Sequence, residues 1–124
     1  MTSGEVRNLH ALLPIAFRLP RKPDISIEFV IDTGFTDQLT LPIEAIIAMD
    51  LPLLARIPAD LADGSTIEMS MHEATILWHG LERQVRVLAA GSRPLLGTRL
   101  LENFDLYVQF REGGRVTVEA QVEI

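Results

Sequence analysis

ISIEFVIDTG, residues 25–34, combines the pattern of a β-strand with an acid at the point where that strand ends. Apolar and polar residues alternate over most of residues 25–31, which is typical of a half-buried strand. Asp32 follows the strand, and Gly34 frees the backbone to turn. We therefore predict that a rigid strand end holds the Asp32 carboxylate so that it points out of the sheet, where it can take part in chemistry.

A second motif, RPLLGTRLL, occupies residues 93–101. It is an apolar stretch broken by Gly97 and followed by a short segment of helical character. Together the two motifs resemble those of the retropepsin-type aspartic proteases, which are single-lobe relatives of pepsin. The resemblance covers roughly residues 14–118. The turn Asp32-Thr33-Gly34-Phe35 is similar to that of a bacterial and archaeal group within this family.

The resemblance implies a mainly β fold, a closed acid-protease β-barrel with one or two short helices. It also implies that Asp32 is the catalytic residue, that the Thr33 hydroxyl ties two catalytic turns together across a dimer axis, and that Gly34 lets backbone approach backbone near the substrate. Each residue has a structural alternative. These alternatives are an Asx turn at Asp32, a local hydrogen bond from Thr33 and a positive φ at Gly34.

Residues 62–65 contain Asp-Gly, a strong signal for a hairpin tip. By resemblance, five residues form the flap that closes over a bound peptide: Ala62, Asp63, Gly64, Ser65 and Thr66. Gly64 would allow the flap to move, and an ordinary exposed hairpin is the alternative. Three residues of the second motif are expected to pack beneath the acid turn rather than to take part in chemistry: Leu95, Leu96 and Gly97.

Two residues depart from the pattern of the family. Many relatives carry a hydroxyl directly after the turn glycine, where it bonds the catalytic carboxylate, but Phe35 cannot do this. Thr36 is the nearest hydroxyl that could replace it. Asp37 adds a second acid, which would raise the proton affinity of the site if it pointed at Asp32; we expect it to face solvent instead.

Alternation also predicts two hairpins outside the flap. Residues 15–19 should pair with residues 25–31 across a short turn rich in proline and charge. Residues 104–110 and 116–122 should pair across the glycines at 113–114. Both hairpins support a mainly β architecture.

A short helix is predicted between the acid turn and the flap. Residues 39–41 form a brief extended piece, Pro42 opens a helix over residues 43–49, and Pro52 ends it. Three isoleucines should share one face of this helix: Ile43, Ile46 and Ile47.

Residues 53–90 predict long strands joined by tight turns. Apolar residues occupy odd positions over 67–71 and even positions over 74–78. A shift of one residue reverses the buried face, so we expect a bend or bulge near residues 72–73 and an outer arm that leaves the core. His79-Gly80 should form the next turn.

Composition limits the classes of function. The 124 residues suit one domain, residues 1–124, with no room for two lobes. The formal charge of −6 argues against nucleic acid as a partner, and no apolar run approaches membrane-spanning length. The start of the chain lacks the layout of a signal peptide, and there is no cysteine. We therefore expect a soluble cytoplasmic protein.

Metal and cofactor chemistry is not predicted. The three histidines are dispersed along the chain, and no cysteine accompanies them. His72-Glu73 lacks the second histidine that a zinc-peptidase helix requires one turn later. No glycine-rich phosphate loop with lysine is present.

The resemblance implies an aspartic endopeptidase, and the single acid turn implies that it works as a homodimer. Peptide hydrolysis by carboxylates requires two acids that share a proton, and this chain has a single Asp-Thr-Gly, so the second acid must be Asp32 of another copy. A largely apolar cleft would favour extended peptides with hydrophobic side chains beside the cut. Two alternatives remain open: a module that binds a peptide or protein without cutting it, and a structural β-domain in which the acid turn is a relic.

Overall fold

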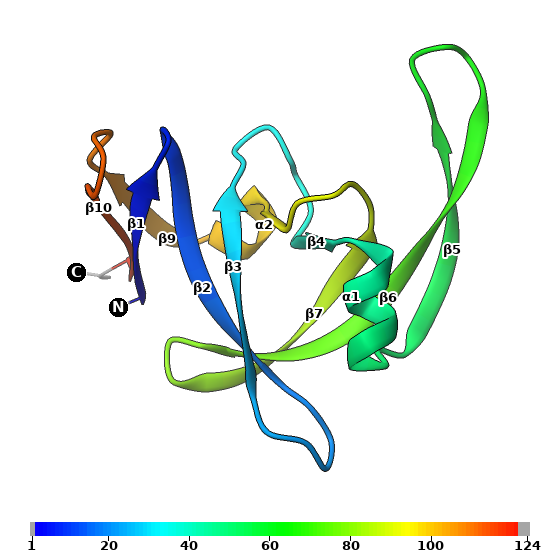
Figure 1. The fold of residues 1–124 in the computed structure, drawn as a ribbon, viewed down its shortest axis with the longest axis horizontal. Coiled ribbons are helices and arrows are strands. Elements are labelled where there is room, and N and C mark those ends of the chain that lie inside the picture. The colour runs from blue at the N-terminus through cyan, green and yellow to red at the C-terminus, as the bar shows by residue number, and fades with distance from the viewer. Residues whose placement is uncertain (1, 122–124) are drawn as a thin grey trace.

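The computed structural model describes residues 2–121, and within them the chain is mainly β with two short helices (Figure 1). The strands are β1 (Thr2–Arg7), β2 (His10–Arg18), β3 (Ile25–Ile31), β4 (Leu39–Leu41), β5 (Leu53–Asp60), β6 (Thr66–Trp78), β7 (Leu81–Ala89), β8 (Leu95–Leu96), β9 (Phe104–Val108) and β10 (Arg115–Ala120). The helices are α1 (Ile43–Met49) and α2 (Thr98–Leu101). The mainly β architecture with short helices is confirmed.

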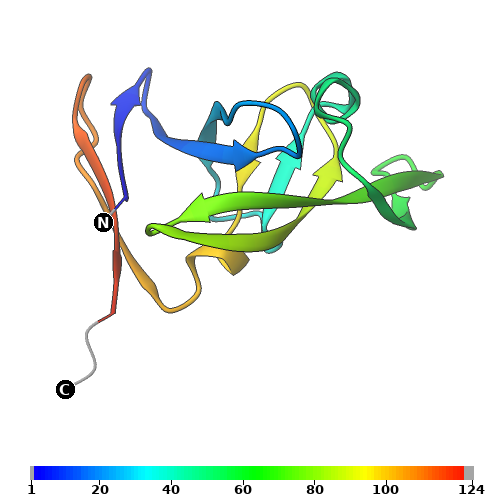
Figure 2. The same cartoon turned by 90° about the horizontal axis from the view of Figure 1, so that it is seen from below.

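The strands are hydrogen-bonded in the order β5-β6-β7-β4-β8-β3-β2-β1-β10-β9, and β2 also pairs with β6. This additional pairing joins β2, β3, β8, β4, β7 and β6 into a continuous ring of neighbours. Figure 2 shows the β5–β6 hairpin extending from one side of this ring and β1, β9 and β10 lying on the opposite side. The acid turn after β3 is therefore held on the ring itself.

The core consists of apolar side chains from the ring strands. Phe17 of β2 and Phe29 of β3 are fully buried, and their rings stack with centroids 5.9 Å apart. Leu39, Ile76 and Leu96 add fully buried side chains from β4, β6 and β8. Because neighbouring ring strands contribute to one packed cluster, the ends of β3 and β8 are rigidly placed.

The predicted hairpins are present. β2 and β3 pair in antiparallel register from Phe17↔Ile25 to Leu12↔Val30, and β9 pairs with β10 in the same manner. β6 and β7 meet at a two-residue turn in which His79 and Gly80 both have positive φ. The end of the segment predicted over 116–122 lies outside the described residues, and Phe110, predicted within a strand, is exposed beyond the end of β9.

The strand β1 and the first part of β2 were not predicted. The reason is local: β1 buries a single large apolar side chain, Val6, so its sequence shows little alternation. The β1–β2 turn consists of Asn8 and Leu9, both with positive φ, and leucine gives no turn signal. Gly4 allows the close approach of β1 to β2, because a Cβ there would lie 1.9 Å from the carbonyl oxygen of Leu12.

The helix α1 has the predicted bounds, but the predicted apolar face is wrong. Ile46 is buried together with Met49, whereas Ile43 and Ile47 are 42% and 71% exposed. The helix contacts the core along a narrow stripe of residues three apart, since it is only about two turns long. Asp50 ends it in the left-handed conformation, and its N–H bonds back to the carbonyl of Ile46.

The predicted irregularity at residues 72–73 is found on the partner strand. β6 pairs with β7 without interruption, and Ala74, Ile76 and Trp78 are buried as the even-numbered face. The register shift falls between Leu53 and Ala55 of β5, opposite the buried His72. Beyond this shift the β5–β6 hairpin leaves the core, which explains why both of its faces carry exposed residues.

No helix within residues 2–121 is long and apolar enough to span a membrane.

Candidate functional site

Asp32 occupies the residue directly after β3, and both its backbone and its side chain are held. Its N–H donates to the carbonyl of Leu96 at 2.9 Å. Its Oδ1 accepts a 2.9 Å hydrogen bond from the N–H of Gly34, and its carbonyl accepts from the N–H of Phe35. The structural alternative, an Asx turn, is therefore present. The Asx turn uses only Oδ1 of the carboxylate. Within residues 2–121, Oδ2 accepts no hydrogen bond, so the half-buried side chain keeps one oxygen available for chemistry.

The end of β3 is fixed by β8. The two strands are parallel, with Val30 opposite Leu95 and Ile31 opposite Leu96. β8 in turn pairs antiparallel with β4, where the Thr40 hydroxyl accepts a hydrogen bond from the N–H of Leu95 at 3.1 Å. Leu96 is fully buried, and Leu95 is half-buried. The second motif therefore lies directly against the strand that carries the acid.

Gly97 supports the turn from below. Its N–H donates to the carbonyl of Gln38 at 2.8 Å, and the N–H of Thr98 donates to the carbonyl of Phe35 at 2.8 Å. A Cβ at position 97 would lie 2.1 Å from the carbonyl oxygen of Asp37 and 2.6 Å from a ring carbon of Phe35. Only glycine therefore fits between α2 and the loop that follows Asp32.

Gly34 matters because it has no side chain next to the Asp32 carboxylate, and its backbone does not adopt a positive φ. The positive φ considered for it is wrong, because Gly34 is not among the positive-φ residues of the described chain. A Cβ at position 34 would lie 3.3 Å from Oδ1 of Asp32, which is tighter than an ordinary contact. Glycine therefore leaves room for the Asp32 carboxylate in its turn.

None of the three residues that follow the acid turn, Phe35, Thr36 and Asp37, forms a side-chain hydrogen bond to Asp32 in the described part of the chain. The Phe35 ring faces Gly97, beneath the turn. Thr36 is exposed, and within residues 2–121 its hydroxyl makes no hydrogen bond to Asp32. Asp37, which we expected to face solvent, has a partly exposed side chain that forms an ion pair with Arg86 at 3.2 Å and accepts from the N–H of Gln38. Asp32 therefore has no second acid of its own chain bonded to it in the described residues.

An open hollow of about 350 Å³ lies beside Asp32. Its walls are formed by His10, Val30, Ile31, Asp32, Thr33, Arg93 and Leu95. The lining is apolar on the β3–β8 side and polar elsewhere. Thr33 is exposed at the edge of this hollow.

Sequence reasoning missed the two polar residues that line this hollow outside the acid turn, His10 and Arg93. The side chains meet although they are 83 positions apart, with Nη1 of Arg93 2.9 Å from Nε2 of His10. Arg93 could have been noticed because it opens the second motif, two residues before Leu95. His10 could not, because its strand was not predicted to begin there.

The five residues predicted to form the flap lie at the tip of the β5–β6 arm, which Figures 1 and 2 show extending away from the ring. Gly64 has a φ of 86°, and no atom lies within 4 Å of a Cβ built there. Oδ1 of Asp63 accepts from both the N–H and the hydroxyl of Ser65, and these hydrogen bonds lower the pKa of the Asp63 carboxyl below its usual value. The carboxylate therefore stays ionised, and the tip keeps its acceptor, at lower pH than an ordinary aspartate would allow.

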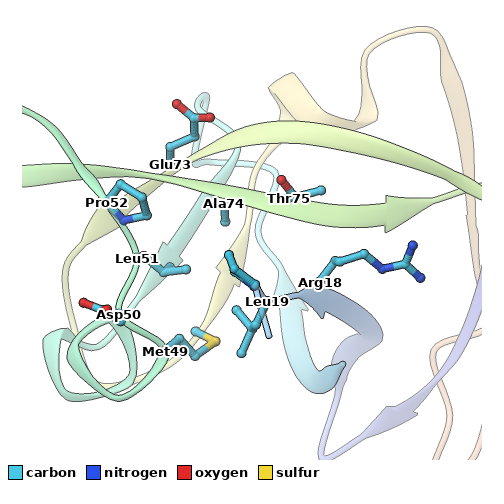
Figure 3. Close-up of a pocket in the computed structure, with 10 residues that line it drawn as sticks. Arg18, Leu19, Met49, Asp50, Leu51, Pro52, Glu73, Ala74 and Thr75 are labelled. Carbon is cyan, nitrogen blue, oxygen red and sulfur yellow. The ribbon is translucent and has the colours of Figure 1, made fainter. Parts of the chain in front are cut away.

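A second cavity, of about 240 Å³, lies between the end of α1, the β2–β3 hairpin and β6 (Figure 3). Leu19, Met49, Leu51 and Ala74 contribute apolar side chains to its wall, and Arg18, Asp50 and Glu73 contribute charged ones. It contains none of the predicted site residues. Arg18 forms ion pairs with Asp24 and Glu82, so its guanidinium is not free to bind an anionic ligand in this cavity.

Within residues 2–121, no group of three or more histidine, aspartate or glutamate side chains is placed to hold a metal ion. The site that the structure assembles from the predicted residues is therefore a single carboxylate in a clamped turn, beside a partly polar hollow.

Comparison with known proteins shows a likeness in fold. No model of a protein family matches the chain, and no curated protein matches it. Among solved structures, the chain is similar to the crystal structure of a retropepsin-like aspartic protease from Rickettsia conorii. The TM-score is 0.57 at 20% sequence identity, and the match covers 94% of this chain and 99% of that chain. At this identity the likeness establishes a retropepsin-like fold, and activity requires a separate argument.

Proposed function

We propose that this protein is an aspartic endopeptidase that hydrolyses peptide bonds with a water activated between the Asp32 carboxylates of two subunits. The observation that carries the proposal is the placement of Asp32. Its backbone is bonded to Leu96, its turn is supported by Gly97, and its Oδ2 is unoccupied within the described residues. The likeness in fold to a retropepsin-like aspartic protease adds independent support.

The chemistry requires a second carboxylate within a few ångström, so that the two acids hold one proton between them. The ionised member then takes a proton from water while the protonated member polarises the scissile carbonyl. Asp37 forms an ion pair with Arg86 and, within residues 2–121, no hydrogen bond with the Asp32 carboxylate, so we do not assign it as the second acid. A symmetric homodimer supplies it, because a two-fold axis at the turn places the same residue on both sides.

The remaining roles follow from this arrangement. The exposed Thr33 hydroxyl would bond across the axis to the partner turn, and Ala62, Asp63, Gly64, Ser65 and Thr66 would close over the peptide as the flap. Phe35 and Thr36 complete the turn as support. The ring of six paired strands would be the closed acid-protease β-barrel. We propose a single domain over residues 1–124, of the Asp-Thr-Gly-Phe group of these proteases, acting in the cytoplasm on peptide or protein substrates without a cofactor.

One observation favours a second candidate, a peptide- or protein-binding module with weak or no activity. Where many relatives place a hydroxyl that bonds the catalytic carboxylate, this chain has Phe35, and Thr36 makes no such bond within residues 2–121. The carboxylate then lacks one of the groups that fix its ionisation. The two candidates share a fold and differ in whether water is activated.

Specific activity should depend on protein concentration. Each subunit brings one acid, so a monomer is expected to be inactive and the activity per subunit should rise with the dimer fraction. Cleavage of a mixed peptide library, measured over a hundredfold dilution series alongside sedimentation velocity, tests this. A constant specific activity across the dissociation range would contradict the two-subunit site.

A further inference from the structure

Arg93 lines the hollow beside Asp32, two residues before the start of β8. Its side chain is exposed, and its Nη1 donates to Nε2 of His10 at 2.9 Å. Because a guanidinium can only donate, His10 is the acceptor in this contact, through Nε2. His10 lies at the start of β2, whose pairing with β1 and β3 fixes its backbone. One edge of the guanidinium is thus held in place by a residue of the paired sheet.

The rest of the guanidinium is available to a ligand. Arg7, Arg18 and Arg86 are each within ion-pair distance of an acid, whereas Arg93 forms no ion pair within residues 2–121. Of its five N–H donors, one is used by His10, so a planar carboxylate could be bound by two others. Arg93 is therefore an exposed arginine that shares a hollow with Asp32 and forms no ion pair in the described part of the chain.

The position of Arg93 determines what it could select. Arg93 and Asp32 line the same hollow, together with Val30, Ile31 and Leu95. A peptide held with its scissile bond at Asp32 would place a neighbouring side chain in this hollow. An acidic side chain there would be repelled by the ionised carboxylate of the acid pair unless a cation compensated it, and Arg93 supplies that cation.

We propose that Arg93, positioned by His10, forms a subsite that selects an aspartate or glutamate side chain close to the scissile bond of the substrate. This rests on the proposed peptidase function and adds an acidic preference to the hydrophobic one expected from the apolar part of the cleft. The recognised chemistry is a carboxylate beside apolar contacts from Val30 and Leu95. Glutamine and asparagine, which match these side chains in shape, lack the charge.

A positional peptide library with mass-spectrometric mapping of the cut sites tests the subsite. In the wild-type protein, one position near the cut should favour glutamate over glutamine by about fivefold to tenfold in kcat/KM, as for a partly exposed charge-assisted pair. In Arg93→Gln that ratio should fall to about one, because the variant has no charge with which to distinguish glutamate from glutamine. Arg93→Lys should keep part of the preference, because it keeps the charge and loses the planar pair of donors.

Two controls separate selection from general effects. Arg21→Gln removes an arginine from the distant β2–β3 turn and should leave the ratio unchanged. His10→Leu should lower the ratio, and His10→Gln, whose amide oxygen can accept from Arg93, should restore it in part. Equal cleavage of glutamate and glutamine peptides by the wild type would overturn the proposal, as would a preference that survives in Arg93→Gln. Loss of the dimer in Arg93→Gln would also overturn it, by assigning Arg93 to the subunit interface.

The failure of this subsite and the failure of the peptidase function are distinguishable. If the wild type cleaves peptides without acidic preference, the subsite is wrong and the function stands. If it cleaves no peptide, the proposed peptidase function is wrong, and the subsite is then tested by measuring peptide binding. Fluorescent peptides that differ only in glutamate or glutamine are then titrated against the Asp32→Asn protein. A fivefold difference in affinity that disappears on adding Arg93→Gln supports the subsite, and equal or absent binding overturns it.

Discussion

Peptide hydrolysis is expected to fall by about a thousandfold or more in Asp32→Asn, the change with the largest effect on activity. Asparagine can neither share a proton with the second acid nor take one from water. The fold should remain, because the Asn Oδ1 can still accept from the N–H of Gly34, as the Asp32 Oδ1 does. Initial rates on a mapped peptide substrate and a thermal unfolding curve of each protein provide the measurement.

Asp37→Asn is the matched control for this experiment. It removes a nearby acid whose partner is Arg86 rather than Asp32, so activity should stay within about threefold of wild type and the loss of one ion pair should cost about 1 kcal/mol or less. A protein that only binds peptides would keep its partner in Asp32→Asn. Full hydrolysis by Asp32→Asn would remove Asp32 from the reaction altogether.

Gly97→Ala is expected to cost about 3 kcal/mol or more of the free energy of unfolding, the largest effect on stability that we predict. The added methyl would lie 2.1 Å from the carbonyl oxygen of Asp37 and 2.7 Å from that of Phe35, and neither backbone group can move without shifting the acid turn. Denaturant unfolding measures the loss. Activity should fall with it, because the displaced loop is the one that follows Asp32.

Gly64→Ala is the comparison, because Gly64 has a positive φ but no close neighbours, whereas Gly97 is closely surrounded. At position 64 a Cβ would meet no atom within 4 Å, but the φ of 86° is unfavourable for alanine, so a cost of about 1 kcal/mol is expected. The two substitutions therefore separate a clash from backbone strain. Equal costs for both would show that Gly97 is not pressed against the acid turn.

The sequence predicts those parts of the fold that depend on local signals. Alternation over residues 25–31, the Asp-Gly at the flap tip and the paired glycines at 113–114 each specify a strand or a turn within a few residues, and the structure contains all three. The face of α1 was predicted wrongly because all three isoleucines fit a helical stripe. Only tertiary contacts decide that Ile46 is buried and Ile47 is not.

The motif residues of the candidate site could be predicted from the sequence, but the contacts between residues far apart in the chain could not. Asp32 and Gly97 were identified from their motifs. The contact of Arg93 with His10 and the ion pair of Asp37 with Arg86 join residues 83 and 49 positions apart, and neither pair carries a pattern that a single sequence displays. The space that Gly34 leaves for Oδ1 of Asp32 likewise follows from atomic distances and not from turn propensity.

The most direct test of the two-subunit site is a subunit-mixing measurement. Wild-type and Asp32→Asn proteins are mixed at a fixed total concentration, subunits are allowed to exchange, and peptide hydrolysis is measured against the wild-type fraction. If each site needs both aspartates, an equal mixture retains about a quarter of the activity, because only dimers of two wild-type subunits can hydrolyse peptides. If each Asp32 acts alone, the same mixture retains about half, and the paired-acid site is contradicted.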